Sequence, residues 1–189
     1  MSAAPAHATA AQLAAGLEAV RLAPSDLGRL ELIVSRPAPG ERRRLDVGRL
    51  DFVHGLLGDS WHQRPSSKMP DGGPNPYAQV TVMGVRAVRL LSASEDPDRW
   101  ALAGDQLFVD FDFSEETLPV GSRVAVGDAL LLVTAEPHLG CGKFARRFGV
   151  DALKAVNSDE GRALRLRGLN ARVLEGEDIQ VGDSVTKRT

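Results

Sequence analysis

The stretch that decides the fold is Val124-Ala125-Val126-Gly127-Asp128-Ala129-Leu130-Leu131-Leu132-Val133. Two short apolar runs flank a Gly-Asp pair, a pattern typical of two antiparallel strands joined by a tight turn. Gly-Asp pairs also begin at Gly58, Gly104 and Gly182, with short apolar segments between them. Short strands punctuated in this way indicate a small β-barrel.

Other segments have strand patterns as well. Further strands are predicted at residues 30–34, 79–83 and 107–113. The last of these alternates four apolar side chains with polar ones, the period of a half-buried strand, and Gln106 falls on its polar face. Residues 169–174 and 179–181 are expected to pair as a second hairpin around Gly176.

Helices are expected around this sheet. Residues 9–22 are rich in alanine and place Leu13, Leu17 and Val20 on one helical face, before Pro24 ends the pattern. Short helices are predicted at residues 85–91, 144–150 and 151–156. The predicted class is therefore α+β, mainly β with peripheral helices and a small closed barrel.

Residues 55–76 contain four prolines and several glycines, which favours a long loop over a regular element. A loop of this length in a compact domain is usually functional or mobile. His54, Asp59 and His62 could approach one metal ion there, but three possible ligands in a glycine-containing loop are a weak metal signal.

The composition is that of an ordinary globular domain. Of the 189 residues, 43% are hydrophobic and 25% are charged, which excludes a disordered chain, a coiled coil and a fibre. No apolar stretch approaches the roughly 18 residues of a membrane span, and the first 15 residues lack the pattern of a signal peptide. We therefore expect a cytoplasmic protein without a membrane partner.

The net charge of −2 hides a basic segment. Residues 138–174 carry eight cations against three anions, a net +5, while the rest carries 15 cations against 22 anions, a net −7. A local basic region on an acidic body suits a compact anion such as phosphate better than nucleic acid, and only Phe144 and Phe148 could stack on bases there. The alternative is an ordinary solvated helix face.

Cys141 is the one cysteine, so no internal disulfide can form. It lies between Gly140 and Gly142 at the start of a predicted helix, where the helix dipole, Lys143 and Arg146 would favour thiolate over thiol. A thiolate can act as a nucleophile or as a ligand of a soft metal. The alternative is a small buried hydrophobic residue. P-loop, G-x-S-x-G, H-E-x-x-H and dinucleotide motifs are absent.

Several motifs occur in an order that resembles the MOSC domain, which is named after the C-terminal part of molybdenum cofactor sulfurases. The similarity covers about residues 45 to 185. The motifs are Gly58-Asp59-Ser60-Trp61-His62, Gly104-Asp105-Gln106-Leu107-Phe108-Val109, residues 118–128, residues 132–137 with Cys141, residues 167–173, and Val181-Gly182-Asp183. The family also includes stand-alone bacterial proteins and amidoxime-reducing enzymes.

The resemblance implies a barrel related to that of the pyruvate kinase barrel domain. It divides the chain into an N-terminal helix and lead-in strand (1–44), the MOSC domain (45–185) and a tail (186–189). Many members have proline where this chain has Gly140. The aminotransferase-like domain of the full sulfurases, which uses pyridoxal phosphate, is not expected within the first ~45 residues; pyridoxal phosphate is therefore only a family association, since no lysine stands out as its partner.

The resemblance also implies a site. The family cysteine carries sulfur or coordinates molybdenum, and Cys141 matches it, so Cys141 is the predicted catalytic residue and metal ligand. Basic residues hold the phosphate of the molybdenum cofactor (molybdopterin). The predicted cofactor-binding residues are Lys143, Arg146, Arg165, Arg167, Asn170, Arg172, Asp59, His62 and His138.

Three functions remain open. The first is a molybdenum-cofactor-dependent reductase of N-hydroxylated compounds, or a sulfur-transfer protein, with a redox protein or a sulfur donor as partner. The second is a non-catalytic module that holds the cofactor or a partner. The third is a structural domain with an inert thiol.

Overall fold

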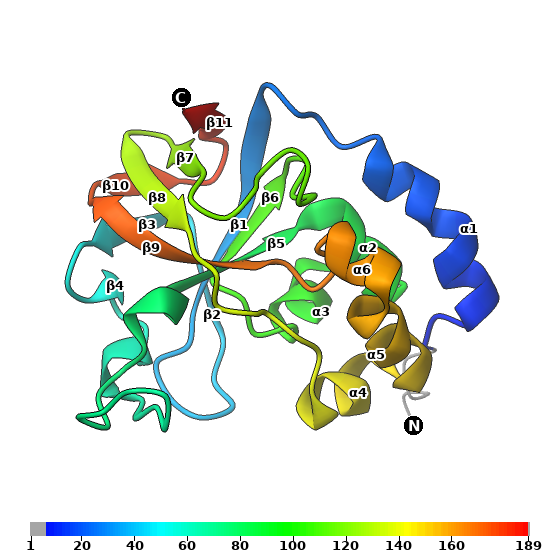
Figure 1. Ribbon diagram of the computed structural model, residues 1–189, viewed down its shortest axis with the longest axis horizontal. Coiled ribbons are helices and arrows are strands. Elements are labelled where there is room, and N and C mark those ends of the chain that lie inside the picture. Colours follow the sequence, from blue (N-terminus) through cyan, green and yellow to red (C-terminus); the bar gives the residue numbers. More distant parts are fainter. Residues whose placement is uncertain (1–6, 189) are drawn as a thin grey trace.

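One sheet closes on itself in the computed structural model, which describes residues 7–188. Its strands follow the order β11-β7-β8-β9-β5-β6-β1, and β1 pairs again with β11, so that seven strands form a closed barrel (Figure 1). β5 and β6 are parallel and the other neighbours are antiparallel. The barrel strands are β1 (Gly28–Ser35), β5 (Val80–Gly84), β6 (Leu107–Asp110), β7 (Arg123–Val126), β8 (Ala129–Val133), β9 (Leu169–Glu175) and β11 (Ser184–Arg188). The predicted closed β-barrel is confirmed.

Four short strands complete the β structure. β2 (Arg43–Leu45) extends the main sheet from β1, while β3 (Val47–Asp51), β4 (Gly55–Leu56) and β10 (Asp178–Gln180) form a separate small sheet. None of β2, β3, β4 and β11 was expected, because segments of two to five residues are too short to give a clear periodic signal.

The hairpin expected around Gly176 does not form, and that prediction was wrong. β9 pairs with β5 and β8, whereas β10 pairs with β3, with Ile179 opposite Gly48. The reason is the close approach of β3: a Cβ on Gly176 would lie 2.5 Å from the carbonyl oxygen of Leu50. The amide of Leu50 donates to the carbonyl of Glu177, so β3 takes the place of the hairpin partner.

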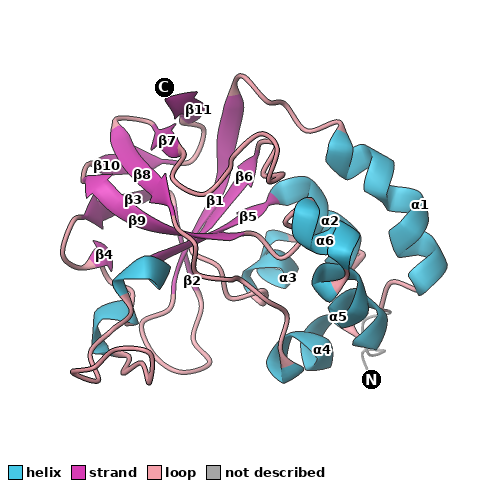
Figure 2. Cartoon of the chain, viewed as in Figure 1, coloured by secondary structure: helices cyan, strands magenta, loops and turns pink. Residues whose placement is uncertain are grey.

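The helices gather on one side of the barrel (Figure 2). They are α1 (Ala10–Arg21), α2 (Val85–Ser92), α3 (Pro97–Ala101), α4 (Gly142–Phe148), α5 (Val150–Asn157) and α6 (Asp159–Ala163). The predicted helices correspond to α1, α2, α4 and α5, with ends shifted by a few residues; α3 and α6 are one-turn helices without an apolar period. No helix within residues 7–188 is long and apolar enough to cross a bilayer.

Two apolar cores result from this arrangement. One fills the barrel, and the other lies between the sheet and the helices. β6 contributes to both, since Leu107 and Val109 face the barrel interior and Phe108 packs under the helices. The predicted half-buried strand is therefore wrong: Gln106 is fully buried, and its side-chain oxygen accepts from the amide of Thr81 at 2.7 Å.

The division of the chain at residue 45 stays a prediction. β1 and β2 lie within the predicted N-terminal part, and β1 pairs with β6 and β11 in the barrel. Residues 186–188 of the predicted tail belong to β11, while residues 1–6 and 189 lie outside the described part of the chain.

Gly168 fixes the start of β9 against β5. Its φ of +93° falls in the region that favours glycine, and a Cβ there would lie 2.2 Å from the carbonyl oxygen of Val82. This contact places Arg167 and Asn170, on either side of Gly168, at the end of the barrel nearest the helices.

We expect Gly168→Ala to lower the free energy of unfolding much more than Gly121→Ala. Gly121 has a similar φ of +90° but no atom within 4 Å of the Cβ position, so alanine there costs only backbone strain of about 1–2 kcal/mol. At Gly168 a clash with backbone adds roughly 1–3 kcal/mol. Urea denaturation of both variants measures the difference; equal losses would contradict the close packing at Gly168.

Candidate functional site

Cys141 lies in the loop that leaves β8 and immediately precedes α4, with its side chain exposed. The loop is held from both sides. The amide of Asn170 donates to the carbonyls of Glu136 and Pro137, and the side chain of Asn157 bonds both the N–H and the carbonyl of Gly140. A Cβ at Gly140 would lie 2.6 Å from the side chain of Val156, so the loop packs closely against α5 at this position.

The environment of the Cys141 thiol favours the thiolate. Partial burial raises its pKa, but hydrogen bonds from the backbone N–H groups of Phe144 and Lys143 lower it, as do the charges of Arg167 and Lys143. The net result is a pKa below that of an ordinary cysteine. Arg146 is exposed and is not among the main causes of this shift.

A cavity of about 650 Å³ opens beside Cys141. Among its lining residues, all from the described part of the chain, are five cations and no carboxylate. The cations are Arg42, Arg64, Lys143, Arg147 and Arg167. Burial lowers the pKa of Arg42 and of Arg64, and neighbouring arginines lower it further. The cavity therefore holds uncompensated positive charge and suits an anion.

Arg167 occupies the innermost part of this arrangement. Its Nη1 donates to Asp105 at 2.6 Å, and the other oxygen of Asp105 lies 2.8 Å from Nε2 of His138. The guanidinium stacks on Phe144 at 5.1 Å, while its Nε is buried and has no hydrogen-bond partner within the described residues. Burial alone would raise the pKa of Asp105, but Arg167 and His138 hold it well below the ordinary range. The carboxylate is thus ionised and fully paired.

The pKa of His138 is also lowered, which for a histidine favours the neutral form. Burial and the charge of Arg167 lower its pKa, against the raising effect of Asp105. We therefore take its imidazole as neutral near pH 7.

Some predicted site residues meet in the cavity and others do not. Lys143 and Arg167 line it with Cys141, whereas Arg165, Asn170 and His138 line a smaller neighbouring cavity of about 180 Å³, which Arg167 shares. Arg146 is on the surface, and Arg172 lies over the ring of Phe52 at 5.2 Å, outside both cavities.

Asp59 does not line the cavity, but it supports the two loops that do. It is buried and accepts hydrogen bonds from Nε and Nη2 of Arg36, and from the backbone N–H groups of Arg36 and Trp61. Ser60 donates to the carbonyl of Arg36. These bonds join residues 37–42 to residues 60–64, the two loops that supply Arg42 and Arg64.

The metal site considered for His54, Asp59 and His62 is not formed. The Asp59 carboxylate is used by Arg36, and His54 faces Asp51 at 2.9 Å. His62 is exposed in the 3₁₀ turn Trp61–Gln63. Throughout residues 7–188, no three His, Cys, Asp or Glu side chains converge as metal ligands.

Sequence reasoning missed Arg42, Arg64 and Arg147. Arg147 lies in the basic segment but belongs to no recognised motif. Arg42 and Arg64 come from the acidic remainder of the chain. The run Arg42-Arg43-Arg44 was a usable signal, because three adjacent arginines next to a long loop are unusual on an acidic body.

Solved structures share this fold. The YuaD protein from Bacillus subtilis is 15% identical, with a TM-score of 0.62 over 85% of this chain and 95% of its own. YiiM from Escherichia coli is 17% identical, with a TM-score of 0.54 over 85% and 70%. YiiM from Geobacillus stearothermophilus is 12% identical, with a TM-score of 0.57 over 86% and 75%. At these identities the likeness concerns the fold alone.

Sequence comparison identifies the family. No curated protein matches the chain. The family model of the MOSC domain matches residues 78–186, from the turn before β5 into β11. Because this match spans more than half of the chain and includes Cys141 and Arg167, the protein belongs to the MOSC domain family.

Proposed function

We propose that this protein binds the molybdenum cofactor in the cavity beside Cys141 and uses the Cys141 thiolate as a molybdenum ligand or sulfur carrier. One observation carries the proposal: an exposed thiol of lowered pKa lies on the wall of a cavity lined by five cations and no carboxylate within the described chain. Thiolate is a soft ligand that suits molybdenum, and it can also carry sulfane sulfur.

The residues fit this group in size and charge. A cavity of about 650 Å³ falls within the range of small-molecule sites. Arginine grips phosphate with two parallel hydrogen bonds, and Arg42, Arg64 and Arg147 are available around the opening. The buried Nε of Arg167 lacks an acceptor, which a bound anion would provide. When bound, the cofactor supplies the redox chemistry of molybdenum.

The chain's own groups have separate tasks in this proposal. Lys143 and the cavity arginines bind and orient the phosphate, and Asp105 holds Arg167 in place. The backbone N–H groups of Lys143 and Phe144 lower the pKa of Cys141 and so favour its thiolate. The reaction is sulfur transfer or the reduction of N-hydroxylated compounds, with a redox protein or sulfur donor as partner, and we assign it to the cytoplasm. Pyridoxal phosphate has no part in the proposal.

The primary test is the composition of the purified protein. Produced in a host that makes the cofactor, the wild type should contain molybdenum and pterin in near-stoichiometric amounts, as measured by elemental mass spectrometry and by fluorescence of the oxidised pterin. Protein that carries neither, and that does not take up cofactor when it is supplied, would refute the proposal.

Alkylation of Cys141 should titrate with a pKa below the ~8.5 of a free cysteine. Lys143→Gln removes a charge that lowers this pKa, so the midpoint of the rate of reaction with iodoacetamide should move upward by several tenths of a pH unit, on the order expected for one exposed charge. Lys154→Gln is the matched control, because it removes the same charge from α5 without lining the cavity. A wild-type midpoint at or above that of free cysteine would contradict the assignment.

Cys141→Ser should retain most of the bound pterin and lose turnover to the background rate. Serine preserves the size of the side chain, but its hydroxyl is a harder and far less acidic donor that cannot replace thiolate or form a persulfide. Pterin content and the rate of N-hydroxylated substrate reduction or sulfur transfer are measured on the same preparation. Wild-type turnover by this variant would show that Cys141 is not the catalytic ligand.

Removing the cavity charges should weaken retention of the cofactor. We expect the triple variant Arg42→Gln, Arg64→Gln, Arg147→Gln to lose cofactor, with Kd rising about tenfold or more per side chain. The control triple variant Arg43→Gln, Arg146→Gln, Arg172→Gln removes as much charge outside the cavity and should retain it. Equilibrium dialysis against free cofactor measures both. If the control triple loses cofactor instead, the anion binds to the surface arginines.

A further inference from the structure

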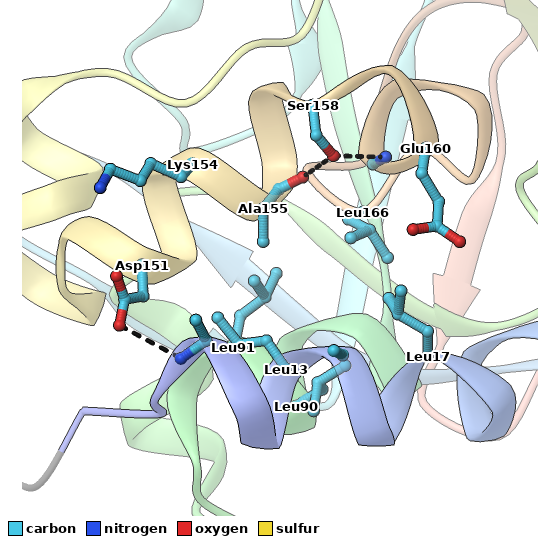
Figure 3. Close-up of a pocket in the computed structure, with 13 residues that line it drawn as sticks. Leu13, Leu17, Leu90, Leu91, Asp151, Lys154, Ala155, Ser158, Glu160 and Leu166 are labelled. Atoms are coloured by element: carbon cyan, nitrogen blue, oxygen red, sulfur yellow. Dashed lines mark hydrogen bonds between the residues drawn. The ribbon is translucent and has the colours of Figure 1, made fainter.

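An apolar cavity of about 300 Å³ lies under α1, apart from Cys141 (Figure 3). It is lined by α1, α2, α5 and α6, and its lining includes five leucines. Two of its charged residues hold α1 in place: Asp151 accepts from the backbone N–H of Ala10 at 3.1 Å, and Glu160 pairs with Arg21. The cavity is therefore part of how α1 is attached.

The small cavity of about 180 Å³ next to that of Cys141 is different, because hydrogen-bond acceptors without donors belong to its lining. Asn170 lines it and is only 3% exposed. The Nδ2 of Asn170 donates to the carbonyls of Glu136 and Pro137, which fixes the orientation of the amide. The buried Oδ1 of the same amide has no donor among residues 7–188.

His138 supplies a second acceptor to this lining. Its Nε2 lies 2.8 Å from the carboxylate of Asp105, which is ionised and can only accept, so Nε2 carries the proton. In the neutral imidazole Nδ1 is then an acceptor, and no group in the described part of the chain donates to it. Two acceptors of this kind favour a ligand that donates hydrogen bonds.

The charges that line the small cavity are compensated. Each of its five charged residues has an opposite charge nearby. The pairs are Arg162 with Asp159, Arg167 with Asp105, Glu136 with Lys68, and Arg165 with Glu115. The small cavity therefore favours an uncharged ligand, unlike the Cys141 cavity, whose charged lining residues in the described chain are all cations.

We propose that the small cavity binds a short aliphatic primary amide. Its NH₂ group donates to Oδ1 of Asn170 and Nδ1 of His138, since a primary amide presents two N–H bonds, whereas an alcohol has one donor and an aliphatic amine is a cation near pH 7. Arg162, whose side chain is half-exposed and keeps further N–H groups, donates to the amide oxygen.

The size and the apolar part of the lining set the length of the amide. At about 30 Å³ per small group, the volume accommodates roughly six heavy atoms. Val120 and Leu139 line the cavity although they are largely exposed, and they cover the alkyl group. Cys141 does not line the small cavity, so the proposal does not rest on the cofactor proposed for the larger one.

Titration of the full-length protein with isobutyramide, followed by nuclear magnetic resonance, tests the proposal. The ¹⁵N signal of Nδ1 of His138 should move on saturation, because this nitrogen gains a hydrogen bond. N,N-dimethylacetamide has the same number of heavy atoms but no N–H group, and it should bind about tenfold more weakly or less, as expected for two lost hydrogen bonds. Isobutyrate, an anion of the same shape without a donor, should also bind more weakly.

Variants that fill the small cavity supply the second arm. Val120→Trp enlarges a side chain of the lining and should weaken isobutyramide about tenfold or more. Val150→Trp is the matched control and should have no effect, because Val150 is 59% exposed against 58% for Val120 but lies outside the cavity. Leu139→Trp fills the cavity from the cysteine loop and replaces Val120→Trp if that variant fails to fold.

Three results would overturn the proposal. Isobutyramide leaves the Nδ1 signal of His138 unchanged, or one of the two compounds without a donor binds as tightly, or binding survives both filling variants. Tighter binding of isobutyrate would mean that the arginines, and not the two acceptors, select the ligand.

Discussion

The buried carboxylate of Asp105 is the constraint on which the site depends. It lies two residues before β6, and it pairs with Arg167, two residues before β9, and with His138 in the cysteine loop. A fully buried carboxylate is costly unless cations and hydrogen-bond donors surround it. Loss of Arg167 would leave its charge without compensation, whereas loss of His138 would remove one hydrogen bond. The barrel, the cysteine loop and the cavity floor are therefore fixed relative to one another by a single ionised group.

The buried carboxylate of Asp59 has a similar structural role. It pairs with Arg36 and so holds together the two loops that carry Arg42 and Arg64. These arginines differ in whether a carboxylate compensates their charge. Arg36 and Arg167 are neutralised by buried carboxylates, whereas Arg42, Arg64 and Arg147 have no carboxylate partner among residues 7–188. Like charges held together without compensation lower stability, so a bound anion would stabilise the fold as well as occupy the site.

The barrel and the position of Cys141 directly before a helix could be predicted from the sequence, because alternation, Gly-Asp turns and the glycines around Cys141 are local signals. The features that could not be predicted depend on contacts between residues far apart in the chain. Gln106 looked polar and exposed, but it is buried because β6 has a core on each side. Arg42 and Arg64 were missed because their approach to Cys141 depends on the Arg36–Asp59 pair, which joins segments 23 residues apart and leaves no periodic trace.

The helices line two cavities beside the barrel. Residues Leu153, Val156 and Asn157 of α5 pack around Gly140 and so support the cysteine loop, while Lys154 and Ala155 face the cavity under α1. One short helix therefore touches both sites on different sides. Gly140 permits this contact, since a Cβ there would lie 2.6 Å from the side chain of Val156 and 2.8 Å from that of Leu153, which would have to shift. A closed barrel alone has its interior filled by side chains, whereas the Cys141 cavity is lined partly by α4, and the cavity under α1 is lined by α1, α2, α5 and α6.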